Sequence, residues 1–128
     1  IPIGVSASPF LLSSLPSLGL QSWPAGEVVI AEGDAGEDIF VLYTGSLSVW
    51  RGKTQAKKIG ALEPGDFFGE IGFLLKSTRS ATVRTETPCK LFRFPAKEFS
   101  SVLKRHKVLA SRVKEVASGR LQTIFDQQ

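Results

Sequence analysis

The middle of the chain, from Glu27 to about Phe94, is a series of short apolar segments separated by glycines. Regularly spaced turn residues between short apolar segments are typical of antiparallel strands. This texture therefore predicts an antiparallel β-sandwich or barrel. The glycines that separate the segments are Gly33, Gly36, Gly45, Gly52, Gly60, Gly65 and Gly69.

Several of these segments alternate in polarity with a period of two residues. Successive side chains of a strand point to opposite faces, so such alternation indicates a strand with one buried face. We expect each strand to bury one face. The positions predicted to point inward are Ile39, Val41 and Tyr43, then Leu47 and Val49, then Ala81 and Val83.

The two ends of the chain differ from this body. Residues 1–24 contain four prolines, which permit at most a short helix around Phe10 to Leu15 and predict an N-terminal arm. After Pro95 the apolar residues recur every three or four positions, which predicts two closing helices. Their apolar positions are Phe99, Val102, Leu103, Leu109, Val113, Val116, Ala117, Leu121, Ile124 and Phe125.

Composition narrows the class of protein. A chain of 128 residues that is 42% hydrophobic and 22% charged fits one compact domain. Its net charge of +4 suits an anionic ligand but does not single out nucleic acid. The single cysteine, Cys89, excludes a disulfide framework within the chain and favours a reducing, cytoplasmic location. The chain has no apolar run of about 20 residues that would span a membrane, and its lack of methionine indicates a fragment of a longer protein.

Two short motifs resemble a nucleotide-binding loop and a catalytic or metal-binding site, but neither interpretation is supported by the surrounding residues. The triplet Gly52-Lys53-Thr54 resembles the end of a phosphate loop, but Leu47 occupies the place of the required first glycine, so we interpret it as a hairpin tip. The only histidine, His106, lies among lysines and arginines and is expected at a solvated helix end. Without a metal cluster or a nucleophile elbow, the sequence predicts no enzyme.

The segment from Phe68 to Leu75 is too irregular for a strand and predicts one or two helical turns beginning at Gly69. The free amides at such a helix start attract an anion, and Arg79 can add a bidentate contact to the same anion. Glu70 beside these groups suggests a neutral hydroxyl partner, as on a ribose. The alternative is that Glu70 and Arg79 form an ion pair that only stabilises the loop.

The run FGEIGFLL, with RSATV beginning nine residues after Glu70, closely resembles the phosphate-binding cassette of the cyclic nucleotide-binding domain family. This family includes the catabolite activator protein-like and protein kinase A regulatory subunit-like β-rolls. The resemblance implies a mainly β fold, an eight-stranded antiparallel, jelly-roll-like β-roll with a short N-terminal helix, a short cassette helix and two C-terminal helices. It divides the chain into an arm (1–22) and a nucleotide-binding domain (23–128). Supporting segments are Pro24–Ile30, Glu32–Asp34, Tyr43–Leu47 and Pro64–Glu70.

The resemblance also implies a ligand, a 3′,5′-cyclic nucleotide, and no metal or other cofactor. Gly69 and Ile71 would offer backbone amides, Glu70 would accept the ribose 2′-hydroxyl and Arg79 would neutralise the cyclic phosphate. We favour cAMP over cGMP, although Ser80 stands where a hydroxyl can reach guanine. The full set of predicted ligand contacts is Phe68, Gly69, Glu70, Ile71, Gly72, Arg79, Ser80 and Ala81.

The expected function is a regulatory sensor whose C-terminal helix caps the base and acts on an effector outside this chain. The predicted lid residues are Leu121, Ile124 and Phe125, supplemented by Arg120 or Arg112. The same stripe is equally compatible with core or dimer packing. One alternative is the sensor half of a transcription factor, although nucleic acid is not expected to bind this domain. Another is a docking domain that binds no nucleotide, against which the intact Glu70 and Arg79 argue.

Overall fold

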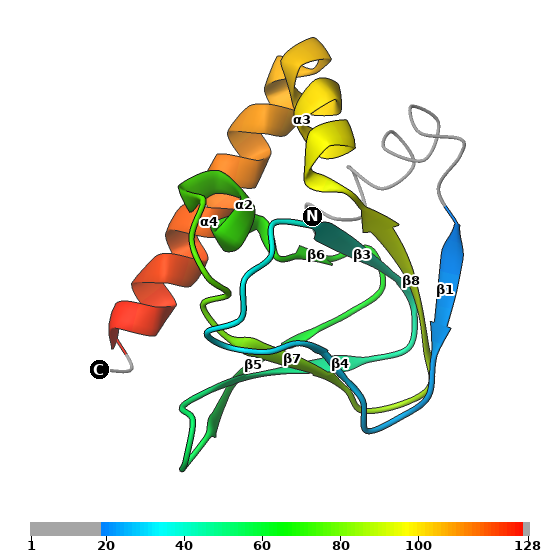
Figure 1. Ribbon diagram of the computed structural model, residues 1–128, viewed down its shortest axis with the longest axis vertical. Helices are drawn as coiled ribbons and strands as arrows, with labels where there is room; N and C mark the ends of the chain where they lie inside the picture. The colour runs from blue at the N-terminus through cyan, green and yellow to red at the C-terminus, as the bar shows by residue number, and fades with distance from the viewer. Residues whose placement is uncertain (1–18, 127–128) are drawn as a thin grey trace.

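The computed structural model describes residues 19–126, except for the side chains of residues 125 and 126. In that part of the chain, two four-stranded sheets face each other (Figure 1), with strand orders β1-β8-β3-β6 and β2-β7-β4-β5. All pairings are antiparallel, which confirms the predicted eight-stranded β-roll. The strands are β1 Leu20–Trp23, β2 Val28–Ile30, β3 Ile39–Thr44, β4 Leu47–Arg51, β5 Lys57–Leu62, β6 Phe67–Phe68, β7 Thr82–Thr85 and β8 Cys89–Phe94.

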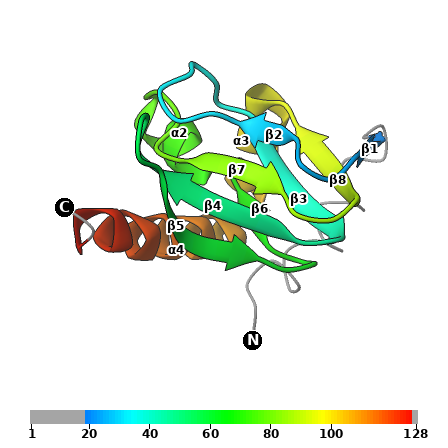
Figure 2. The same ribbon diagram turned by 90° about the horizontal axis from the view of Figure 1, so that it is seen from below.

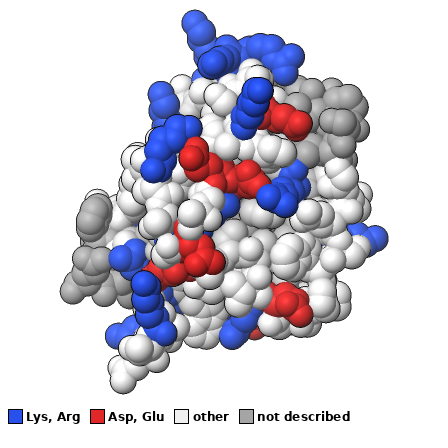
Figure 3. Space-filling model, in the orientation of Figure 1, with Lys and Arg blue, Asp and Glu red and all other residues white. Residues whose placement is uncertain are grey.

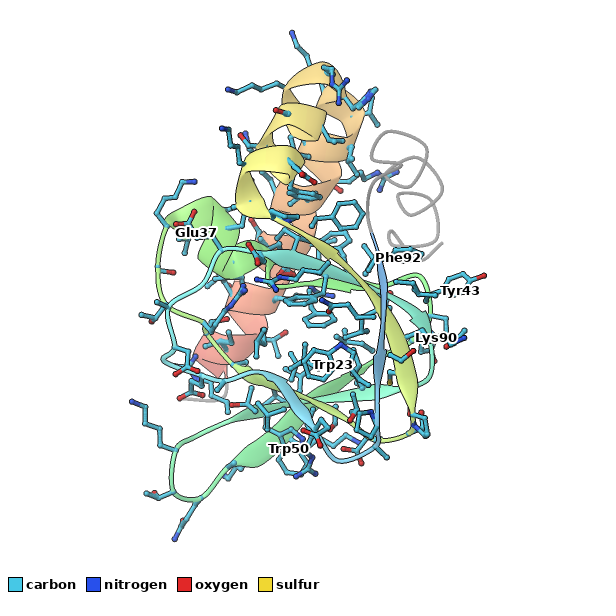
Figure 4. The ribbon with its side chains drawn as sticks, turned by 45° about the vertical axis from the view of Figure 1, so that its right-hand side comes forward. Trp23, Glu37, Tyr43, Trp50, Lys90 and Phe92 are labelled. Atoms are coloured by element: carbon cyan, nitrogen blue, oxygen red, sulfur yellow. The ribbon has the colours of Figure 1, made fainter. Side chains whose placement is uncertain are left out.

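Strand β3 corrects the expectation that each strand buries one face. Ile39 and Val41 pack against the C-terminal helices, while Phe40 and Leu42 pack between the two sheets, so both faces are buried. Tyr43, predicted to point inward, is 53% exposed and contacts the ring edge of Phe92 on the outside of the roll (Figure 4). The helices cover only the first part of the strand, and its end is left in solvent.

Strand β1 begins earlier than the predicted domain. It pairs with β8, with Trp23 opposite Cys89, and the boundary placed between residues 22 and 23 falls inside it. Trp23 points into the space between the sheets (Figure 4), where it packs against the core cluster that holds Leu42 and Leu91. The helix expected around Phe10 to Leu15 lies outside the described residues.

Within residues 19–126, three helices complete the fold: α2 Glu70–Leu75, α3 Ala96–Arg105 and α4 Lys107–Asp126. They confirm the predicted cassette turn and the two closing helices. The backbone at His106 leaves the helical region and separates α3 from α4. α4 then passes beside α2 and β5 (Figure 2), because Ala117 and Ile124 pack against Ile71. None of these described helices combines the length and the apolar character needed to cross a membrane.

Candidate functional site

Gly69 is the residue at which the chain passes from β6 into the helix of the site. It follows β6 and precedes α2, with φ at 91°, a left-handed conformation that side chains other than glycine adopt only at a cost. A Cβ atom at this position would lie 2.7 Å from the backbone oxygen of Asp38 and 2.8 Å from Nη1 of Arg79. The close approach of β6, the start of β3 and Arg79 therefore requires glycine here.

Arg79 is the buried cation of the site, only 6% exposed. Its backbone is held by two hydrogen bonds, from its N–H to the oxygen of Asp34 and from the N–H of Gly33 to its own oxygen, both 2.8 Å. Its Nη1 donates to the oxygen of Gly69 at 3.2 Å. Burial lowers the pKa of the Arg79 guanidinium, while the nearby Asp38 and Glu70 carboxylates act in the opposite direction. An arginine stays charged under these conditions, so the site keeps one positive charge ready for an anion.

Glu70 is the buried anion, 2% exposed at the start of α2. Its Oε2 accepts a hydrogen bond from the Ile71 N–H at 3.2 Å, and its Oε1 pairs with Nη1 of Arg120 on α4. The same Nη1 donates to the backbone oxygen of Phe67 at 2.8 Å. Glu70 thus pairs with Arg120 and not with Arg79, so the ion pair considered as an alternative from the sequence is not the one formed.

These groups line a cavity of about 260 Å³ between α2, α4 and the sheet β2-β7-β4-β5. All eight predicted ligand residues contribute to its wall. Residues that were not predicted as ligand contacts supply most of the remaining surface, and most of them are apolar. They are Ile30, Val49, Ile59, Gly60, Ala61, Leu62, Asp66, Val83 and Thr123.

The predicted lid residues on α4 have four different outcomes. Arg120 and Ile124 line the cavity. Leu121 instead packs on the cluster of Ile71, Ala117 and Ile124, and the side chain of Phe125 lies outside the described part of the structure. Arg112 forms an exposed pair with Glu115 at 3.6 Å and contributes nothing to the cavity.

The missed wall residues come mainly from β4 and β5. The segment Lys57–Leu62 begins with two exposed lysines, and only Leu62 is fully buried, so it lacks the strict alternation that marks an inward face. The sequence signal that could have identified this part of the wall was the apolar pair Ile59 and Leu62, which follows the predicted hairpin tip at Gly52. Their place in the cavity depends on β5 pairing with β4, in which Gly60 lies opposite Val49.

The arrangement combines a buried cation, a buried carboxylate and an apolar wall in one cavity. It can bind a small anion that also carries a hydroxyl and a flat apolar part. The described lining residues include no histidine, cysteine or lysine, and no group of metal-ligating side chains occurs among residues 19–126.

Comparison with known proteins identifies the class. The model of the cyclic nucleotide-binding domain family matches residues 20–106. Over 125 residues the chain is 31% identical to the potassium/sodium hyperpolarization-activated cyclic nucleotide-gated channel 4 of Homo sapiens, and 30% identical to channel 2 of Mus musculus. Each match covers 97% of this chain but only 10% and 14% of the channels, so the chain spans a small part of these relatives.

Solved structures share the fold. The catabolite activator protein of Thermus thermophilus superimposes with a TM-score of 0.80 and 21% identity, covering 95% of this chain and 59% of that one. The sensor domain of the transcriptional regulator DNR from Pseudomonas aeruginosa gives 0.73 and 22%, covering 97% and 91%. At these identities the likeness concerns the β-roll and its helices.

Proposed function

Because the chain belongs to the cyclic nucleotide-binding domain family, which is non-catalytic, we propose that it is a sensor module that binds one 3′,5′-cyclic mononucleotide per chain in the cavity described above. The observation that carries the proposal is the buried pair of charges, Arg79 and Glu70, on either side of Gly69 in one cavity. A cyclic phosphodiester bears a single negative charge, which one arginine with backbone amides can balance. The ribose hydroxyl then needs an acceptor, and Glu70 is the buried carboxylate beside it.

The contacts of Glu70 are compatible with this role. Each of its oxygens already accepts one hydrogen bond, from Ile71 and from Arg120. A carboxylate offers about four lone-pair directions, so a ribose hydroxyl can be added while Arg120 stays bound, and the Ile71 N–H can turn from Oε2 to the phosphate. In the proposed complex, Gly69 and Ile71 supply amides to the phosphate, Ser80 and Ala81 flank it from the strand side, and Phe68 and Gly72 complete the cassette.

Isothermal titration of the 128-residue chain with cAMP, cGMP and cyclic di-GMP tests the proposal. We expect saturable binding of a cyclic mononucleotide at one site per chain. Failure of all three nucleotides to bind at millimolar concentration would reject the sensor function and favour a docking domain. Binding of the dinucleotide alone would keep a sensor but replace its ligand.

Nucleotide preference centres on Ser80. Its side chain is half-buried at the cavity wall, and its backbone oxygen accepts a hydrogen bond from Nη1 of Arg51 at 3.0 Å. Val49 and Ile59 make the adjoining wall apolar, and we propose cAMP as the preferred ligand.

The Ser80→Ala substitution separates the two nucleotides. If the hydroxyl serves guanine, cGMP affinity should fall by about 1 kcal/mol, the net value of one hydrogen bond, while cAMP affinity stays the same. Titration of both nucleotides into the variant measures this difference. Equal losses would assign Ser80 to phosphate binding or to the local fold, and Thr123→Val, at another hydroxyl of the same wall, is the matched control.

We propose that α4 is the lid and the output element. Arg120 ties it to Glu70 and to the oxygen of Phe67, and Ile124 lies on the cavity wall. A ligand that engages Glu70 therefore acts directly on the contact that docks α4, so its binding energy can shift the position of the helix. The effector would be a domain or a protein outside this chain. The buried free thiol of Cys89 is consistent with the proposed cytoplasmic location.

Truncation after Gly119 tests the lid. It removes Arg120, Leu121 and Ile124, so we expect an affinity loss of about 1–2 kcal/mol, mainly through faster dissociation. Stopped-flow dissociation rates and sedimentation velocity on the same protein measure this, with a chain that ends at Asp126 as control. An unchanged rate together with an altered oligomeric state would show that the stripe is an interface between copies.

A further inference from the structure

The turn between α3 and α4 forms an exposed basic corner, which we define as Lys104, Arg105, Lys107 and Val108. Figure 3 shows blue side chains covering this top end of the molecule. Residues 99–114 contain five lysines and arginines and no acidic residue. Since the whole chain has a net charge of +4, the rest of it sums to −1. The positive charge of the domain is therefore concentrated on the helical hairpin.

Only some of the positive charges at the corner stabilise the helices that carry them. Lys104 and Arg105 lie in the last turn of α3, where cations favour the helix dipole. Lys107 lies in the first turn of α4, which contains no acidic residue, and there a cation opposes the dipole. Among residues 19–126, no salt bridge joins any basic residue of the corner to a carboxylate; the salt bridge nearest in sequence is Arg112 with Glu115. Neither helix stability nor ion pairing therefore accounts for all of the positive charge at the corner.

Val108 supplies the second feature of the corner. It is 79% exposed, the largest value among the exposed large hydrophobic residues of the described chain. It follows Lys107 in the first turn of α4, beside the turn between α3 and α4 that lies at one end of the molecule (Figure 1). Phosphate recognition alone, as on nucleic acid, uses the cations but gives no advantage to an exposed valine. A bilayer surface uses both, because headgroup phosphates attract lysine and arginine while an apolar tip enters the interface.

We propose that the basic corner binds the surface of an anionic lipid bilayer. The surface is independent of the nucleotide site, because none of its four residues lines that cavity. It belongs to the same helix, however: Arg120 follows Lys107 along α4 by about 20 Å at 1.5 Å per residue. The hairpin would hold the domain against the membrane while the far part of α4 contacts the ligand.

Vesicle co-sedimentation tests the proposal with the 128-residue chain. The probes are vesicles of phosphatidylcholine alone and vesicles with about 30% phosphatidylserine, a composition that gives a negative surface potential. Combined Lys104→Gln, Arg105→Gln and Lys107→Gln should weaken binding to the anionic vesicles roughly 100-fold, since each cation near such a surface contributes about fivefold. Val108→Ser should cause a smaller loss, on the order of tenfold or less.

The β4–β5 hairpin offers a matched control. Combined Lys53→Gln, Lys57→Gln and Lys58→Gln removes three positive charges from exposed positions of a hairpin that has no exposed large hydrophobic residue. This variant should retain most of its vesicle binding. Equal losses in both triple variants would show that net charge alone acts and would overturn the proposal.

Other outcomes of these experiments test lipid binding independently of nucleotide binding. Binding to neutral and anionic vesicles with equal strength, or tighter binding to a double-stranded DNA fragment at the same salt concentration, would also overturn the lipid assignment. Cyclic nucleotide titration of the corner variant should match that of the unmodified chain, because the cavity is untouched. If the unmodified chain binds vesicles but no nucleotide, the sensor proposal fails and the lipid proposal stands.

Discussion

Arg79→Ala is expected to weaken cyclic nucleotide binding by about 2–4 kcal/mol, or roughly 30-fold to 1000-fold in the dissociation constant. The guanidinium is buried and already charged, so it meets the phosphate without being drawn out of water at that moment. Without it, the phosphate would face only the amides of α2, a helix of six residues. Isothermal titration of the variant with cAMP and cGMP measures the loss.

Two further substitutions interpret that result. Arg84 is close to Arg79 in the sequence, but its guanidinium lies over the ring of Trp50 and does not line the cavity. Arg84→Ala should therefore leave the affinity for the nucleotide unchanged. Arg79→Lys keeps the charge but loses the planar fork, so we expect an intermediate loss. An unchanged dissociation constant for Arg79→Ala, in a variant with normal thermal unfolding, would show that Arg79 does not bind the phosphate.

Gly69→Ala should lower the free energy of unfolding by about 2–4 kcal/mol and abolish most nucleotide binding. Alanine at this position would have to keep a left-handed backbone conformation at φ 91°. Its methyl group would lie only 2.7 Å from the backbone oxygen of Asp38. The other close atom, Nη1 of Arg79 at 2.8 Å, belongs to the side chain that we assign to the phosphate. Relief of the overlap must therefore displace either β3 or Arg79.

Gly26→Ala separates the backbone strain from the overlap. Gly26 also has a positive φ, 82°, but a Cβ atom there would meet nothing within 4 Å. Its substitution should cost only about 1–2 kcal/mol, from the left-handed conformation alone. Urea denaturation gives the stability of both variants, and titration gives their affinity. Equal costs with unimpaired nucleotide binding would mean that the packing around Gly69 tolerates a side chain.

Much of the fold could be predicted because its signals are local. Glycine-separated apolar segments gave the antiparallel strands, and the three-to-four spacing after Pro95 gave α3 and α4. The cassette helix was predicted for the same reason, from the segment Phe68 to Leu75. The eight predicted ligand residues came from the resemblance to the family, and all of them line one cavity. Short-range geometry, such as a glycine before a short helix, is encoded in adjacent residues.

Features that join distant segments required the tertiary structure. The pairing of Glu70 with Arg120 spans 50 residues, and nothing in the local sequence selects Arg120 over Arg112, the other arginine of α4. The apolar wall from β4 and β5, the burial of β3 on both faces and the exposure of Tyr43 likewise depend on which surface each segment meets. Local sequence determines the conformation that a segment prefers, but the partner that covers it is selected by the packing of the whole chain, where burial of apolar area and pairing of buried charges are decided together.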